Sequence, residues 1–264
     1  MGQFSFFQVC AGLVLALIVS FSSFRFRLLT VDGAIAAGVL GTVIFGLCGL
    51  SWAVPMIVFF FSSSLVSRSK PRTDSDLQFE KTSIRDSWQV LANGGVGGVL
   101  SFLQFLVPDD KWCVAYLGSV AAVTADTWGT EVGMLTTGRV FLITRLQRVP
   151  RGTSGGISVV GTLAGGSGAL LIAVIGSWFG DLSATATIHV GVAGMAGSLL
   201  DSLLGATVQG QYRCPRCGVI TEKLRHCDSP AVLCGGYRWL SNDWVNLTCA
   251  VGGALVVYFS QVFL

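Results

Sequence analysis

The sequence predicts an all-α fold: a polytopic transmembrane bundle of about eight helices. Of the 264 residues, 52% are hydrophobic and only 12% are charged, whereas soluble domains carry about 25% charged residues. Eight apolar segments approach the length needed to cross a bilayer. The 34 glycines are typical of membrane helices that pack closely through small residues. These observations indicate one integral membrane domain over residues 1–264.

The expected helices alternate with polar connections along the chain. The first is predicted to be retained rather than cleaved, because residues 1–5 carry no Lys or Arg and no small-x-small site follows the apolar run. The third is the shortest. The eight segments are about 5–23, 31–50, 52–66, 88–107, 112–134, 157–179, 183–208 and 244–263.

Basic residues gather in alternate connections, which orients the chain. Sixteen of the 17 lysines and arginines lie in the first, third, fifth and seventh connections, and only Lys111 lies in the opposite set. Under the positive-inside rule these four connections are cytoplasmic, with loops at about 67–87, 135–156 and 209–243. We therefore expect a multi-pass protein of bacterial inner-membrane type with both termini outside. The net charge of +3 is too small to indicate a nucleic-acid partner.

An acidic stretch inside the fifth apolar segment is the strongest candidate for a functional site. It holds Asp126 and Glu131, and one acid at a membrane centre costs about 2.5–3.5 kcal/mol on insertion scales. Two acids need a partner, and Mg²⁺, which takes oxygen ligands, is the simplest. On an unbroken helix the two side chains lie roughly 140° apart, and a bend at Gly129 changes that angle. Neighbouring hydroxyls or the headgroup region are the alternative partners.

Polar side chains of five expected helices fall on the cytoplasmic side. The orientation places Asn93 in the first turns of the fourth helix, and Asp126 and Glu131 in the cytoplasmic half of the fifth. The other polar residues at this level are Thr153, Ser154, Ser158, Thr162, Asp201, Ser202, Gln209, Asn242, Asp243 and Asn246. A transporter more often places its site near the midplane, so this distribution favours an enzyme site at the cytoplasmic interface.

A stripe of small residues in the seventh segment ends in an acid. Gly194, Gly197, Ser198, Asp201 and Gly205 recur at helical spacing and share one face. Small residues on this face admit a neighbouring helix, so the acid is expected to project into the bundle, where acids are functional by default. The alternative is a packing stripe whose acid is bonded to a hydroxyl.

The sequence Thr153-Ser154-Gly155-Gly156 is predicted to start the sixth helix, after Arg148 and Arg151. Free N–H groups at a helix start and nearby arginines favour phosphate binding. A polar helix cap explains the Thr and Ser equally well, and the glycine spacing matches neither a P-loop nor a dinucleotide motif.

The third connection is strongly basic. Arg85 is nearest to Asn93 and is a candidate to hold a nucleotide or lipid phosphate. The alternative is ordinary topology signalling and attraction to anionic membrane lipids. The basic residues of this connection are Arg68, Lys70, Arg72, Lys81 and Arg85.

Four cysteines and a histidine cluster in the seventh connection. Cys214-Pro215-Arg216-Cys217-Gly218 has the pattern of a zinc knuckle, and four soft ligands complete a closed structural Zn²⁺ site. The expected set is Cys214, Cys217 and Cys227 with either His226 or Cys234, within 214–234. A cytoplasmic location keeps thiols reduced and favours a metal over a disulfide. The alternative is an exposed loop with free thiols.

Five blocks of sequence together resemble a known family. The chain is similar to the integral membrane family catalogued as domain of unknown function 92, which includes transmembrane protein 19 and the phytyl-phosphate kinases of plants and cyanobacteria. The resemblance covers nearly the whole chain, and the Cys/His loop resembles prokaryotic members only. The blocks are 89–95, 125–131, 153–158, 197–202 and 242–246.

The resemblance implies phosphoryl transfer from a nucleoside triphosphate, with CTP expected, to an isoprenyl monophosphate lipid. Asp126, Glu131 and Asp201 would hold Mg²⁺, which such transfer needs together with positive charge on the phosphates. Asn93, Asn242 and Asn246 would orient phosphate or metal-bound water. Arg85, Arg148 and Arg151 would take up phosphate charge. The competing predictions are another lipid-phosphate or nucleotidyl transferase, and a membrane transporter.

Overall fold

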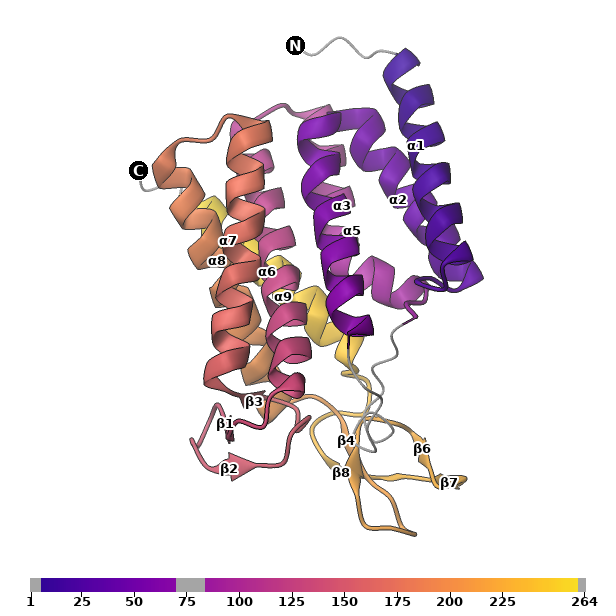
Figure 1. Cartoon of the computed structure of the whole chain (residues 1–264), viewed down its shortest axis with the longest axis vertical. Helices are drawn as coiled ribbons and strands as arrows, with labels where there is room; N and C mark the ends of the chain where they lie inside the picture. Colours follow the sequence, from indigo (N-terminus) through magenta and orange to yellow (C-terminus); the bar gives the residue numbers. More distant parts are fainter. Residues whose placement is uncertain (1–5, 70–83, 261–264) are drawn as a thin grey trace.

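A computed structural model describes residues 6–69 and 84–260. Within them the chain forms eight long α-helices packed in a bundle, with short β-strands gathered at one end (Figure 1). The predicted all-α polytopic fold is confirmed. The helices are α1 (Phe6–Arg25), α2 (Val31–Cys48), α3 (Leu50–Arg68), α5 (Ser87–Leu106), α6 (Asp110–Leu135), α7 (Val159–Gly180), α8 (Ala184–Thr207) and α9 (Asn242–Ser260).

Helix α6 is the centre of the bundle. Seven of the described helices are long and apolar enough to cross a membrane, and α6 is the exception. It packs against α3, α5, α7, α8 and α9, and every residue from Val114 to Asp126 is buried. Because neighbouring helices separate it from lipid, α6 tolerates polar groups that a lipid-facing helix would not.

Side-chain caps and a glycine mark several of the helix boundaries. Thr30 caps α2 by accepting a hydrogen bond from the Gly33 backbone N–H at 3.2 Å, and Asp86 and Gln89 form a capping box at the start of α5. Gly49, with φ of 78°, separates α2 from α3. Helix α3 is longer than the predicted 52–66, because the apolar run continues in helical form on both sides.

The β-strands belong to two connections. The α6–α7 connection forms a three-stranded antiparallel sheet, and the α8–α9 connection forms a second three-stranded sheet and a hairpin. We call residues 208–241 the Cys/His module. The strands are β1 (Val140–Leu142), β2 (Arg148–Val149), β3 (Gly156–Ile157), β4 (Gln211–Arg213), β5 (Ile220–Thr221), β6 (Arg225–His226), β7 (Ser229–Pro230) and β8 (Val232–Gly235).

The four basic connections lie on one side of the bundle. Leu29 and Arg85 pair as a parallel bridge and join the first connection to the third. Ser154 and Glu222 join the fifth to the seventh through a hydrogen bond. Figure 1 shows the strands at the end of the bundle away from the start of α1. Of the basic residues predicted there, Lys70, Arg72 and Lys81 fall outside the described residues.

Candidate functional site

A polar cavity lies on this side of the bundle, between the ends of α6 and α8 and the starts of α7 and α9. The empty space within it, counted together with the solvent at its open mouth, is ≈ 1140 Å³. Its polar lining residues are Asp126, Thr130, Thr153, Ser154, Ser158, Thr162, Ser198, Asp201, Ser202, Gln209, Glu222 and Asn242.

Asp126 and Asp201 come from different helices and line the same cavity. Asp126 closes the buried run of α6 and is only 9% exposed. On α8, the predicted small-residue face is confirmed: a Cβ at Gly197 would lie 2.5 Å from the Cβ of Ala122 on α6. This close contact brings α8 against α6 and directs Asp201 to the cavity that Asp126 lines.

The turn before α7 forms one wall of the cavity. Thr153-Ser154-Gly155-Gly156 does not start the helix as predicted, because α7 begins after Ser158, whose Oγ accepts a hydrogen bond from the Gly161 N–H at 3.1 Å. Gly155 instead has φ of 74° and lies so close to Ala206 that a Cβ would collide with it. The start of α7, with its free N–H groups, opens onto the cavity.

Glu222 is a cavity residue that the sequence analysis missed. It directly follows β5 in the Cys/His module, and its Oε1 accepts a hydrogen bond from Ser154 Oγ at 2.5 Å. Its Oε2 is buried and has no hydrogen-bond partner among the described residues. Glu222 and Asp228 are the two acids in the otherwise basic stretch 209–241. This contrast in charge is the sequence feature that could have identified Glu222 as a candidate site residue.

Arg85 and Asn93 line a different pocket, bounded by α1, α2, α3 and α5. The Arg85 guanidinium carbon lies 5.5 Å from the ring centroids of both Phe59 and Phe60. The Asn93 side chain donates to the Gln89 carbonyl at 2.8 Å. We call this site the apolar pocket, because most of its walls are apolar side chains: Val19, Leu29, Ala37, Leu40, Met56, Ile57, Phe59, Phe60 and Val90.

Glu131 belongs to neither lining. It lies within electrostatic reach of Arg85, and burial lowers the pKa of Arg85 to about 10 while the Glu131 carboxylate opposes that change. The five-residue spacing from Asp126 therefore separates the two acids of α6. Asp126 shares the lining of the polar cavity with Asp201, whereas Glu131 lies toward Arg85, on the α3–α5 side.

The other predicted phosphate-binding residues divide between cavity and surface. Asn242, at the start of α9, lines the polar cavity, and Asp243 lies within electrostatic reach of Asp86 and Glu222. The Asn246 Oδ1 is buried and has no hydrogen-bond partner in the described part of the chain. Arg148 and Arg151 are exposed in the α6–α7 connection and are not part of the cavity lining.

The polar cavity is lined by hard oxygen donors, the type of ligand that divalent cations such as Mg²⁺ take. Asp126, Asp201 and Glu222 supply carboxylate oxygens, the ligands that Mg²⁺ prefers, and hydroxyls surround them. A buried carboxylate oxygen without a hydrogen-bond donor, such as Glu222 Oε2, is costly unless a cation satisfies it.

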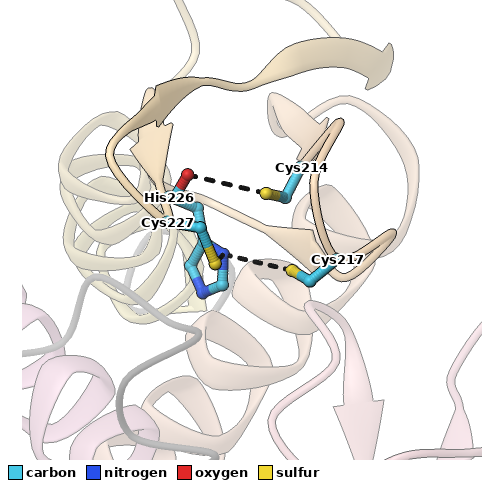
Figure 2. A group of neighbouring side chains, drawn as sticks. All are labelled: Cys214, Cys217, His226 and Cys227. Atoms are coloured by element: carbon cyan, nitrogen blue, oxygen red, sulfur yellow. Dashed lines mark hydrogen bonds between the residues drawn. The ribbon is translucent and has the colours of Figure 1, made fainter.

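A second group of ligands lies in the Cys/His module, outside the cavity. The Sγ atoms of Cys214, Cys217 and Cys227 and one ring nitrogen of His226 all lie within 4.8 Å of one another. Figure 2 shows the four side chains directed toward one another. Cys234 is not in the group, since its Sγ contacts the Gln211 carbonyl at 3.4 Å. Between the two alternatives for the fourth ligand, the structure therefore selects His226.

Comparison with known proteins gives a family and distant relatives. The sequence model described as "Integral membrane protein DUF92" matches residues 14–254. An uncharacterised membrane protein of Methanocaldococcus jannaschii is 33% identical over 84% of this chain and 87% of its own length. Protein PGR of Arabidopsis thaliana is 25% identical over 98% of both chains. Chloroplastic protein VTE6 of the same plant is 23% identical over 89% of this chain and 66% of its own length. No solved structure matches the chain.

Proposed function

The chain belongs to the integral membrane protein family DUF92, and from that premise we propose that it is a membrane-embedded isoprenyl-phosphate kinase. It transfers the γ-phosphoryl group of CTP, or of another nucleoside triphosphate, to a prenyl monophosphate of the phytyl-phosphate type. The observation that carries the proposal is the polar cavity, which three carboxylates and several hydroxyls line at one end of a bundle of apolar helices.

Two similarities support this reaction class. The five sequence blocks resemble a family that includes phytyl-phosphate kinases, and VTE6 aligns with 89% of the chain. Two of those blocks contain Asp126 and Asp201, which share the polar cavity, and a third contains Ser154 and Ser158, which line the same space. The resemblance and the geometry therefore point to the same residues.

Three carboxylates of the cavity would serve as the metal ligands that the reaction requires. Asp126, Asp201 and Glu222 are the residues that would hold Mg²⁺. A bound Mg²⁺ would neutralise the negative charge that develops on the phosphate oxygens during transfer. The protein itself has little covalent chemistry to perform, and its contribution is positioning and electrostatic stabilisation.

The start of α7 is the phosphate-binding part of the site. Its free N–H groups, the positive end of a 22-residue helix dipole and the Ser158 and Thr162 hydroxyls face the cavity. An oxygen of the acceptor phosphate forms a bond to the γ-phosphorus while the bond from that phosphorus to the β–γ bridging oxygen breaks. The nucleoside diphosphate leaves with the bonding electrons. Because the acceptor phosphate is already ionised, the step needs no general base.

The acceptor lipid fits the other half of the bundle. Its isoprenoid tail would lie along the apolar pocket and the lipid-facing surface, and Arg85 would attract the lipid phosphate to this end of the bundle before it enters the polar cavity. Both pockets belong to the side of the bundle with the basic connections, which we propose faces the cytoplasm. A cytoplasmic nucleotide and a membrane-borne acceptor then approach the same end of the molecule.

Product analysis tests the proposal. Purified protein in lipid nanodiscs would be incubated with Mg²⁺, CTP carrying label on the γ-phosphorus, and a panel of prenyl monophosphates of different length and saturation. The expected result is a labelled prenyl diphosphate and CDP. A second incubation with label on the α-phosphorus is expected to leave the lipid unlabelled.

The other outcomes decide between the alternatives. Lipid labelled from the α-phosphorus would replace the kinase with a nucleotidyl transferase that uses the same acids. Labelling of free prenyl alcohol, but not of the monophosphate, would identify a different lipid kinase. If no labelled lipid forms with any acceptor while vesicles containing the protein accumulate a solute, the protein is a transporter.

A further inference from the structure

The Cys/His module presents a cluster of metal-ligating side chains that the phosphoryl-transfer site does not use. Its four ligands come in two pairs, Cys214 with Cys217 and His226 with Cys227, and each pair sits on its own tight turn. Glu222 lies in the segment between the two pairs. The module therefore combines a candidate metal site with one acid of the polar cavity.

The distances in the cluster match a tetrahedral site. The Nδ1 atom of His226 lies 3.4 Å from Cys217 Sγ and 3.2 Å from Cys227 Sγ. Zn–S bonds of about 2.3 Å and Zn–N bonds of about 2.0–2.1 Å place tetrahedral ligands roughly 3.5 Å apart. Three thiolates and one imidazole are a ligand set that selects Zn²⁺ over hard cations such as Mg²⁺. The set is closed, with no position left for substrate.

The backbone of both turns holds the ligands in place. In the first turn, the Gly218 N–H donates to the Cys214 carbonyl at 2.9 Å, and Gly218 has φ of 75°. In the second, Cys227 and Asp228 have φ of 50° and 53° between two paired strands. This is the backbone of a two-residue hairpin with a type I′ turn. A left-handed backbone is unfavourable for cysteine. Metal binding by the Cys227 thiolate would offset that cost and explain why a cysteine occupies this turn.

The cluster also compensates for a small core. The buried residues of the module include Tyr212, Cys214 and Thr221. Most of its other residues are exposed, including Cys217 and Cys227. A segment of this size rarely orders itself by apolar burial alone and depends on a metal or disulfide.

Glu222 is connected to both ligand pairs through short strands. Strand β5 ends at Thr221, and β4 and β5 continue directly into the turn that carries Cys214 and Cys217. On the other side, Arg225 and His226 form β6. If both ligand pairs bind the same metal ion, the segment 217–226 becomes a closed loop. Glu222, in the middle of that loop, accepts the hydrogen bond from Ser154 at the cavity.

We propose that Cys214, Cys217, His226 and Cys227 bind a structural zinc ion, and that this site holds Glu222 in the polar cavity. Zinc binding does not depend on the proposed kinase activity. The role of Glu222 in turnover does rest on that proposed function. Zinc is the positioning element here, and Glu222 is the residue that reaches the reaction site.

Metal analysis tests the zinc site. Protein purified without added metal is expected to contain about one zinc per chain by mass spectrometry of the metal. His226→Ala and Cys217→Ser should lose most of it, whereas His226→Cys, which keeps four soft ligands, should retain it. Cys234→Ser and Cys10→Ser are the matched controls and should leave zinc content unchanged. Zinc-free wild-type protein, or equal zinc in Cys217→Ser, overturns the site.

Hydrogen exchange tests the link to the cavity without using activity. Loss of zinc in His226→Ala should speed amide exchange both in 217–226 and in the facing turn 152–158, and His226→Cys should restore both. Glu222→Gln should keep its zinc and its exchange in 217–226 while lowering phosphoryl transfer on the order of 100-fold. If turn 152–158 is unaffected by zinc loss, the positioning role is wrong.

These readouts separate the two proposals. If the wild-type protein shows no kinase activity but contains zinc and shows the coupled exchange, the proposed function fails and this inference survives. If kinase activity is normal in zinc-free His226→Ala, the proposed function survives and the positioning role fails.

Discussion

The two pockets of this protein lie on the same side of one bundle and are built in different ways. Around the polar cavity, the backbones of neighbouring helices are in direct contact. A Cβ at Gly165 of α7 would lie 2.8 Å from the carbonyl oxygen of Ala125 on α6. A Cβ at Gly161 would lie 2.7 Å from the carbonyl oxygen of Gly129. Around the apolar pocket, the glycines of α5 face the ends of large side chains such as Leu40. One half fixes the positions of carboxylates, and the other accommodates an apolar volume.

This difference suggests a division of labour between chemistry and substrate binding. Backbone contact leaves little freedom for α6, α7 and α8 to shift, so Asp126 and Asp201 are held in one relative position. Contact through flexible side chains lets the apolar pocket adapt to lipid tails of different shape. Four sets of substitutions test this division, from the largest expected effect to the smallest.

Removing a carboxylate from the polar cavity should have the largest effect. Asp126→Asn and Asp201→Asn keep the volume but lose the charge that binds Mg²⁺, so phosphoryl transfer should fall on the order of 10³-fold. Initial rates with labelled CTP and a prenyl monophosphate measure this. The control is Asp181→Asn, an exposed cap at the far end of α7 where Asn tolerates the same left-handed backbone. Equal activity in all three variants would remove the cavity from the mechanism.

Crowding a backbone contact should cost more stability than crowding a side-chain contact. In Gly118→Ala the new Cβ would lie 2.6 Å from the Gly253 carbonyl oxygen, which cannot move away without separating α6 from α9. We expect a loss of about 1–3 kcal/mol of stability. In Gly98→Ala the Cβ would meet the Leu40 Cδ1 at 2.6 Å, and that side chain can rotate. Thermal unfolding in detergent compares the two, and similar midpoints would contradict the proposed difference in packing.

Changing the apolar pocket should affect the lipid substrate alone. Arg85 has a pKa of about 10 and is therefore cationic at neutral pH. Arg85→Met keeps much of its apolar contact with Phe59 and Phe60 and removes the charge, so KM for the prenyl phosphate should rise about tenfold. KM for CTP should stay unchanged. Arg25→Met, at an exposed position in the same half, is the control. A larger change in KM for CTP would place Arg85 with the nucleotide instead.

The exposed arginines of the α6–α7 connection should have the smallest effect. Arg148→Gln and Arg151→Gln remove charges that solvent screens, so KM for CTP should change by less than about threefold. The change should disappear at high salt. Kinetics at low and high ionic strength measure it, and a large, salt-independent loss would mean that the connection closes over the nucleotide during turnover.

The helical part of the fold could be predicted from periodicity and composition. Segment length identified the eight long helices of residues 6–69 and 84–260, because each lipid-facing helix must bury its backbone polar groups and present apolar side chains. The predicted start of the sixth helix was wrong by a short turn. The reason is local: Gly155 takes a left-handed conformation against α8, and Ser158 caps the helix instead.

The candidate site could be predicted only in part. Asp126 and Asp201 were found because an acid in an apolar helix is unusual, and they share the cavity. Glu131 was grouped with them on the same argument, but helix geometry directs it toward the α3–α5 side. Glu222 was missed because an acid in a polar connection is ordinary. Its significance appears only when the module folds back to Ser154.

The sequence alone determined the fold class, the apolar helices of the described residues and the identity of most polar residues near the site, because burial in a membrane restricts which residues each segment contains. The tertiary structure alone decided which of those residues meet. It separated Arg85 and Asn93 from the polar cavity, selected His226 over Cys234 in the Cys/His cluster, and added Glu222. The physical reason is that helix rotation and loop closure depend on contacts between segments distant in sequence, which no local pattern specifies.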